Sequence, residues 1–171
     1  MHLLFVCTGN ICRSPTAERL AVAFAEEFGL PGLTAESAGT RAMVGYPMEP
    51  TAAMVLESLG GDPAGFTARR LTPEIAMGAD LILTMTATQR EKVLTLAPAQ
   101  MKRTFTLREA ARLSQVSGAT TVAELAAARA ALTSPDSEDV ADPIGQDAET
   151  FLEVGTQVAD LLGPVLHQVR G

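Results

Sequence analysis

Short apolar runs alternate with helical segments along most of this chain. A strand that is buried on both faces of its sheet reads as a continuous apolar run of about four to eight residues. The first such run is HLLFV, residues 2–6, and a polar loop and an amphipathic segment follow it. We expect three further strands at 33–40, 79–85 and 102–107, and helices at 14–29, 49–61, 87–97, 121–132 and 147–169. This alternation predicts an α/β fold with three layers: a small doubly wound parallel sheet of about four strands, with helices on both faces.

Length, composition and charge narrow the class of protein. The 171 residues are enough for one ordinary domain, and 47% hydrophobic with 19% charged residues is typical of a globular chain. The net charge of −7 argues against a broad surface for nucleic acid or anionic membrane, which needs clustered cations. No apolar run approaches the roughly 20 residues of a membrane span, and HLLFV is too short for the core of a signal peptide. We therefore expect a cytoplasmic protein that begins at or near Met1.

The chain has only two cysteines, and both stand in VCTGNICRSPTAE, residues 6–18. In a cytoplasmic chain this favours a reactive thiol over a structural disulfide, and the two cysteines and two histidines lack the spacing of a zinc site. The segment joins the first strand to the first helix, where we expect Ser14 as the N-cap and Pro15 as the first helical residue. Backbone N–H groups and the helix dipole then meet at one spot, which can hold an anion.

The side chains of this loop suit the chemistry of a phosphoryl group. Cys7 is expected at the base of the loop, where the field that attracts a phosphate also stabilises a thiolate. Arg13 closes the loop with a planar guanidinium group that fits two oxygens of a tetrahedral anion. Gly9 allows a sharp turn, Asn10 can tie the loop to itself, and the hydroxyl of Ser14 could cap the helix or donate to the sulfur. A thiolate beneath a bound phosphoryl group is a nucleophile placed for attack.

The segment VCTGNICRSPTAE resembles the active-site loop of low-molecular-weight protein tyrosine phosphatases, which carry Cys-x5-Arg-Ser near the N-terminus. Four further motifs stand in the order that the family has them: SAGT (37–40), RRLT (69–72), ADLILTM (79–85) and ADPIG (141–145). The resemblance implies a single phosphatase domain over residues 1–171, a small doubly wound parallel sheet, and no cofactor or metal.

The resemblance also implies a role for each residue of the loop. Cys7 would be the nucleophile that forms a phosphocysteine intermediate. Arg13 and the loop amides would hold the phosphoryl oxygens. The residues of this phosphate-binding loop, besides Cys7 and Arg13, are Thr8, Gly9, Asn10, Ile11, Cys12 and Ser14.

Two further roles follow from the same resemblance. Asp142, which precedes a proline, would be the general acid that protonates the leaving group and later activates water. Asp136 and Asp139 are rivals, which we interpret as solvated loop charges. Cys12 would lie close enough to Cys7 for a reversible disulfide that protects the thiolate, and the alternative is a small apolar filler behind the loop.

The sequence departs from the family around the substrate ring. Ile144 and Gly145 stand where two aromatic residues often follow Asp-Pro. The chain has no Trp, and Met43, with Tyr46 close by, stands near the place of a common pocket Trp. The segment 108–135 is longer than usual, and we expect an added helix from about 114 to 132.

The sequence predicts a phosphatase that acts on protein phosphotyrosine and small aryl phosphates. One alternative is a protein-arginine phosphatase, whose otherwise similar loop has a Thr where Ile11 stands; the bulkier, apolar Ile11 favours an aryl phosphate. The others are an arsenate reductase on the same loop, which relays oxidation through further cysteines, absent after Cys12, or through an external thiol, and a phosphate-binding module without turnover. The expected partner is a tyrosine-phosphorylated protein, with a bacterial tyrosine kinase of polysaccharide export as one candidate. We expect no nucleic acid or membrane partner, and a monomer or weak dimer.

Overall fold

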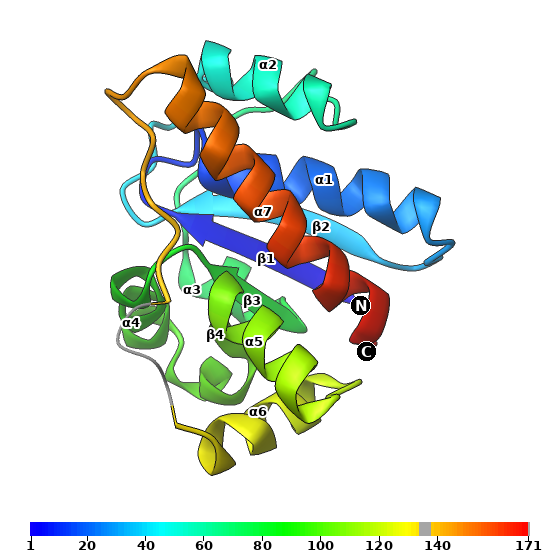
Figure 1. Ribbon diagram of the computed structural model, residues 1–171. Helices are drawn as coiled ribbons and strands as arrows, with labels where there is room; N and C mark the ends of the chain where they lie inside the picture. The colour runs from blue at the N-terminus through cyan, green and yellow to red at the C-terminus, as the bar shows by residue number, and fades with distance from the viewer. Residues whose placement is uncertain (134–137, 171) are drawn as a thin grey trace.

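The computed structural model describes residues 1–133 and 138–170 (Figure 1). Its core is a sheet in which all strand pairs are parallel and the strand order is β2-β1-β3-β4. The strands are β1 (His2–Cys7), β2 (Thr34–Gly39), β3 (Leu81–Thr84) and β4 (Thr104–Thr106). This arrangement confirms the predicted doubly wound parallel sheet of four strands.

Helices cover both faces of this sheet (Figure 1). One face carries α1, α5 and α7, with α7 packed against both α1 and α5, and the other carries α3 and α4. In Figure 1, α7 crosses over β1, and α6 lies beyond the β4 edge. The helices are α1 (Arg13–Glu27), α2 (Pro50–Ser58), α3 (Pro73–Met77), α4 (Ala87–Leu96), the short 3-10 helix η1 (Pro98–Arg103), α5 (Leu107–Ser117), α6 (Val122–Ala131) and α7 (Ala148–Gln168).

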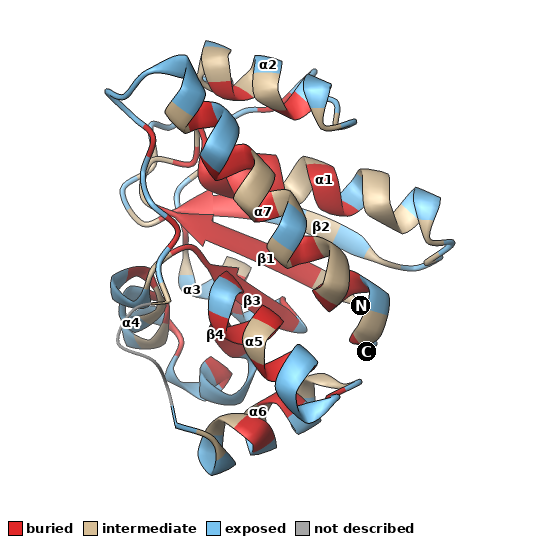
Figure 2. Cartoon of the chain, viewed as in Figure 1, coloured by how far each residue is buried: buried red, intermediate tan, exposed pale blue. Residues whose placement is uncertain are grey.

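The apolar run that begins the chain explains why both faces must be covered. Leu3 and Phe5 pack in the core beneath α1, α5 and α7, whereas Leu4 and Val6 pack in the smaller core beneath α3 and α4. All four side chains are fully buried, and Figure 2 shows β1 and β3 buried along nearly their whole length, whereas β2 is exposed at its start. Because burying one such side chain stabilises the fold by about 1.5–3 kcal/mol, β1 is stable only between two helical layers.

The first helix differs from the prediction at its start. It begins at Arg13, and its N-cap, Cys12, makes no side-chain capping hydrogen bond. Ser14 is therefore not the N-cap, because its hydroxyl is used inside the loop. Pro15 is the third helical residue instead of the first, which is tolerated because the first four N–H groups of a helix have no partner within it.

Among the described residues, three helices lie from Leu107 onward, where we expected two. Gly118 ends α5 in the left-handed region at φ 70°, and Thr121 caps α6 by accepting from the backbone N–H of Glu124. The added helix predicted from about 114 to 132 was therefore wrong: residues 107–117 form a helix of their own, and α6 begins at Val122. The sequence prediction also missed the short helices α3 and η1. Within the described ranges, no helix combines the length and hydropathy that a membrane-spanning segment requires.

Candidate active site

Cys7 lies at the carboxyl end of β1, at the floor of the phosphate-binding loop, as the sequence predicts. Its side chain is buried, and its Sγ accepts from the backbone N–H of Asn10 at 3.3 Å. The Oγ of Ser14 lies 2.9 Å from the same sulfur. The Nδ2 of Asn10 donates to that oxygen at 2.9 Å, and the hydroxyl hydrogen of Ser14 is then available to donate to a deprotonated sulfur. Both contacts suit a sulfur that carries negative charge.

Asn10 ties the loop to two distant segments as well as to itself. It has a φ of 58°, in the left-handed region that Asn adopts more readily than most residues. Its Nδ2 also donates to the Oγ of Ser37 on β2 at 2.9 Å, and its Oδ1 accepts from the backbone N–H of Arg69 at 2.8 Å. The sequence prediction assigned no role to Ser37 or Arg69, although both lie within the SAGT and RRLT motifs that it singled out.

A third support comes from the start of α4. The Nε2 of Gln89 donates to the Oγ1 of Thr8 at 3.1 Å, while its Oε1 accepts from the backbone N–H groups of Met85 and Thr86. The sequence prediction missed Gln89, because a glutamine three residues after a Thr is read only as part of a capping box.

Arg13 and Asp142 meet at the rim of the loop. The Arg13 side chain is buried, and its Nη1 donates to the carbonyl oxygen of Val140 at 2.9 Å. Its Nη2 lies 3.6 Å from the Oδ2 of Asp142, whose side chain is 52% exposed. The rival Asp139 instead accepts from the backbone N–H of Ala87, at the start of α4. The other rival named from the sequence, Asp136, lies outside the described residues.

These side chains surround one pocket of about 290 Å³. Met43 and Ile144 form apolar parts of its wall, while Tyr46 is exposed and is not among the lining residues. Arg41, on the loop after β2, adds a second cation that the sequence prediction did not single out. The lining residues are Cys7, Thr8, Gly9, Ile11, Cys12, Arg13, Arg41, Met43, Asp142 and Ile144. The structure therefore brings together all the predicted site residues, with Asn10 and Ser14 buried beneath the pocket.

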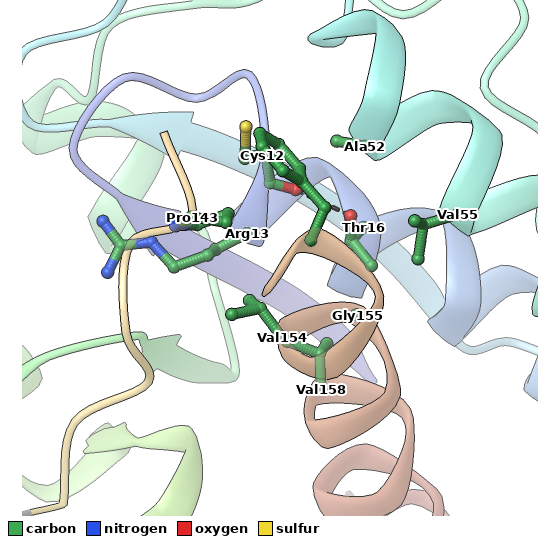
Figure 3. Close-up of a pocket in the computed structure, with 10 residues that line it drawn as sticks. Cys12, Arg13, Thr16, Ala52, Val55, Pro143, Val154, Gly155 and Val158 are labelled. Carbon is green, nitrogen blue, oxygen red and sulfur yellow. Dashed lines mark hydrogen bonds between the residues drawn. The ribbon is translucent and has the colours of Figure 1, made fainter. Parts of the chain in front are cut away.

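Cys12 is buried between this pocket and a small apolar cavity (Figure 3). Burial, together with the nearby carboxylate of Glu49, raises the pKa of the Cys12 thiol far above its usual range. Figure 3 shows the guanidinium group of Arg13 pointing away from the cavity. The cavity is lined by Cys12, Arg13, Thr16, Ala52, Val55, Pro143, Phe151, Val154, Gly155 and Val158. Cys7 and Cys12 are both free thiols.

Comparison with protein families agrees with the site. The family model of the low molecular weight phosphotyrosine protein phosphatases matches residues 2–124. The chain belongs to this family. The match ends before Asp142. The contact between Asp142 and Arg13 is therefore seen in the tertiary structure and is not part of the family match.

Curated relatives of this chain are named as low molecular weight protein-tyrosine-phosphatases. It is 39% identical over 107 residues to the probable low molecular weight protein-tyrosine-phosphatase EpsP of Ralstonia nicotianae, an alignment that covers 63% of this chain and 70% of that protein. It is 43% identical over 96 residues to the low molecular weight protein-tyrosine-phosphatase Etp of Escherichia coli K12. That alignment covers 56% of this chain and 62% of Etp, which is less than two thirds of that relative.

Solved structures of two kinds of phosphatase resemble this family member. The tyrosine phosphatase AmsI of Erwinia amylovora superposes with a TM-score of 0.74 at 27% identity, covering 96% of this chain and 89% of that one. The YwlE arginine phosphatase of Geobacillus stearothermophilus superposes with a TM-score of 0.73 at 30% identity, covering 96% and 90%. The fold is thus shared by phosphatases of both specificities.

Proposed function

We propose that this protein hydrolyses phosphotyrosine in proteins, and small aryl phosphates, through a phosphocysteine intermediate. The observation that carries the proposal is the meeting of three groups at one pocket: the Cys7 sulfur at its floor, and the Arg13 guanidinium with the Asp142 carboxyl group at its rim. Hydrolysis of a phosphate monoester through a covalent intermediate requires three groups: a nucleophile, an oxyanion binder and a proton donor.

In the first step the Cys7 thiolate attacks phosphorus. The new P–S bond forms as the P–O bond to the tyrosine oxygen breaks, while the loop amides and Arg13 hold the three remaining oxygens. Asp142, in its protonated form, gives its proton to the departing phenolate. The products are the free tyrosine side chain and phosphocysteine.

In the second step water attacks the phosphocysteine. Asp142, now a carboxylate, takes a proton from the water as the new P–O bond forms and the P–S bond breaks. The Cys7 thiolate is the leaving group, and the hydroxyl of Ser14 at 2.9 Å is positioned to stabilise it. Inorganic phosphate leaves and the thiolate is regenerated.

A protective role for Cys12 belongs to the same proposal. Peroxide would convert the Cys7 thiolate to a sulfenic acid, and attack by the Cys12 sulfur would form a disulfide and release water. Both residues line the same pocket, which supports this reading. The raised pKa of Cys12 makes its thiol a poor first target for peroxide, and its proton leaves with the sulfenic-acid hydroxyl as water when the S–S bond forms.

Protein-arginine phosphatase activity is the second candidate. The likeness to YwlE arginine phosphatase favours it, as does a pocket wall built from Met43 and Ile144 in place of aromatic rings. Ile11, which lines the pocket, favours the aryl phosphate because its apolar side chain packs against a ring. The arsenate-reductase alternative finds little support, since the chain has no third cysteine to relay oxidation.

The proposed partner is a tyrosine-phosphorylated protein, with a bacterial tyrosine kinase as one candidate, and the proposed state is a monomer or weak dimer. A cytoplasmic location would keep both free thiols reduced, as the mechanism requires.

The test is phosphate release from two peptides of matched sequence, one with phosphotyrosine and one with phosphoarginine, measured with the wild type and with Cys7→Ser. We expect release from phosphotyrosine that Cys7→Ser abolishes, since serine lacks a thiolate. Preference for phosphoarginine would establish the second candidate. Release from neither peptide would leave a phosphate-binding module, or an arsenate reductase if arsenate then drives thiol oxidation.

Ile11→Thr tests the role of Ile11 directly. It keeps the branch at Cβ but replaces the apolar ethyl group of the side chain with a smaller hydroxyl. If Ile11 sets the preference, this variant loses activity on phosphotyrosine relative to phosphoarginine. An unchanged ratio would mean that Ile11 does not select the substrate.

A further inference from the structure

The segment that leads into Asp142 is attached to α5 by two arginines. The Nε of Arg112 donates to the Oε1 of Glu138 at 2.5 Å. The side chains are 25% exposed for Arg112 and 11% exposed for Glu138, so this ion pair is largely shielded from water. One turn earlier on α5, the Nη1 of Arg108 donates to the carbonyl oxygen of Asp139 at 3.2 Å.

The next residues of the segment are attached to the sheet and to the phosphate-binding loop. The carboxylate of Asp139 accepts from the backbone N–H of Ala87 at 2.9 Å. The backbone N–H of Val140 donates to the carbonyl oxygen of Met85, just after β3, at 2.7 Å. Its carbonyl oxygen accepts from Arg13. Residues 138–140 are thus fixed to neighbouring elements immediately before Asp142.

We propose that Arg112 and Glu138 are positioning residues for the general acid. This inference rests on the proposed function, because it concerns where Asp142 stands during phenolate departure. Neither side chain lines the pocket, so their effect passes through the backbone of residues 139–141. The chain would thereby use α5 to set the position of a carboxyl group that is itself half exposed.

The physical argument starts from the charge on Glu138. A largely buried carboxylate that loses its partner is not solvated in place, so the backbone must move to bring it to water. Asp142 lies four residues further on and would move with that backbone. A displacement of about 1 Å at a catalytic group can cost about 100-fold in rate.

The expected loss depends on the leaving group. p-Nitrophenolate is a good leaving group that needs little protonation, whereas phenolate depends strongly on the acid. We therefore expect Arg112→Gln to lower kcat/KM, which reports the step in which the leaving group departs, by about 10-fold for phenyl phosphate and by less than about three-fold for p-nitrophenyl phosphate. Inhibition by vanadate should change less than about two-fold, because the phosphate-binding loop is untouched.

Arg103→Gln is the matched control. It removes an ion pair with Asp80 at 3.7 Å, in which both side chains are about half exposed, at the amino end of β3 and away from the pocket. We expect this variant to keep wild-type kcat/KM on both substrates.

A second comparison separates positioning from general damage to the fold. In an Asp142→Asn background, Arg112→Gln should add less than about two-fold loss, since the acid on which it acts is already absent. An equal loss of kcat/KM on both substrates, an undiminished loss in that background, or no loss in Arg112→Gln alone would overturn the proposal.

Amide hydrogen exchange tests the same inference without turnover. Exchange at the N–H of Val140 should be at least about ten-fold faster in Arg112→Gln than in the wild type or in Arg103→Gln, because the segment that carries it is released. Unchanged exchange would overturn the positioning role. A wild type that hydrolyses neither substrate would instead refute the proposed function, while this measurement would still decide whether Arg112 holds the segment.

Discussion

Replacing Asn10 would test whether buried hydrogen bonds hold the phosphate-binding loop in shape. The Asn10 side chain is fully buried and makes three hydrogen bonds of 2.8–2.9 Å, to the Oγ atoms of Ser14 and Ser37 and from the N–H of Arg69. Asn10→Ala removes all three while keeping a small side chain. The backbone N–H that donates to the Cys7 sulfur remains, so the variant isolates the side chain.

The expected magnitude follows from these contacts. Each hydrogen bond contributes about 1 kcal/mol net, so the three together contribute about 3 kcal/mol. A non-glycine residue at φ 58° adds a strain of about 1 kcal/mol once the stabilising asparagine side chain is gone. The free energy of unfolding of Asn10→Ala should therefore fall by about 4 kcal/mol, a large share of the roughly 5–15 kcal/mol of an ordinary domain.

Asn10→Gly is the matched control. It loses the same three hydrogen bonds but adopts a positive φ without strain. Its unfolded state is more flexible, which costs about 0.5–1 kcal/mol and offsets most of the free energy gained by avoiding strain. Asn10→Gly should thus be destabilised by nearly as much as Asn10→Ala, with a difference of no more than about 0.5 kcal/mol.

The assay is equilibrium unfolding in urea followed by circular dichroism, since the chain has no Trp to report by fluorescence. The kcat for p-nitrophenyl phosphate should fall by about 100-fold in both variants, because Ser14 loses the donor that orients its hydroxyl toward Cys7. A loss of less than about 1 kcal/mol, or a wild-type kcat, would refute the reasoning that this side chain organises the loop.

Two further predictions concern the cavity behind the loop. Cys12→Ser should change kcat less than about two-fold under reducing conditions but should recover less activity when dithiothreitol follows peroxide; full recovery would contradict a protective disulfide with Cys7. Gly155→Ala should destabilise the fold by about 1–3 kcal/mol, because the added Cβ would stand 2.5 Å from the Cγ1 of Val55. Adding Val55→Ala should relieve part of that loss, and strictly additive unfolding free energies for the two changes would show that the contact is not the cause.

Local features of the sequence predicted where the loop lies between strand and helix. The run HLLFV, the polar segment after it and the helix that follows are adjacent in sequence, so strand, loop and helix could be read in order. That order alone places Cys7 at a strand end, where the structure has it, and Arg13 at the end of the loop, whereas in the structure Arg13 is the first residue of α1. Patterns of this kind are predictable because they depend on backbone geometry over a few residues.

Other local predictions failed where a side chain had a tertiary use. Ser14 looked like an N-cap, yet its hydroxyl is taken by Cys7 and Asn10, which only the folded loop brings into reach. The predicted helix from about 114 to 132 ignored Gly118, whose left-handed conformation ends α5. In both places helix propensity was read correctly, but it did not decide where the helix begins or ends.

The sequence by itself determined the parallel α/β architecture and the strand, loop and helix that carry Cys7 and Arg13. The tertiary structure decided which distant groups meet there: Ser37, Arg69 and Gln89 beneath the loop and Arg41 at its rim, where Asp142, already named from the sequence, lies beside Arg13. The reason is the strand order β2-β1-β3-β4. It gathers the loops that follow β1, β2 and β3 at the carboxyl ends of the strands, and no local pattern states which loops will meet there. The segments of Arg69 and Asp142 come from further along the chain and join this end through backbone hydrogen bonds, from Gly39 to Arg69 and from Val140 to Met85.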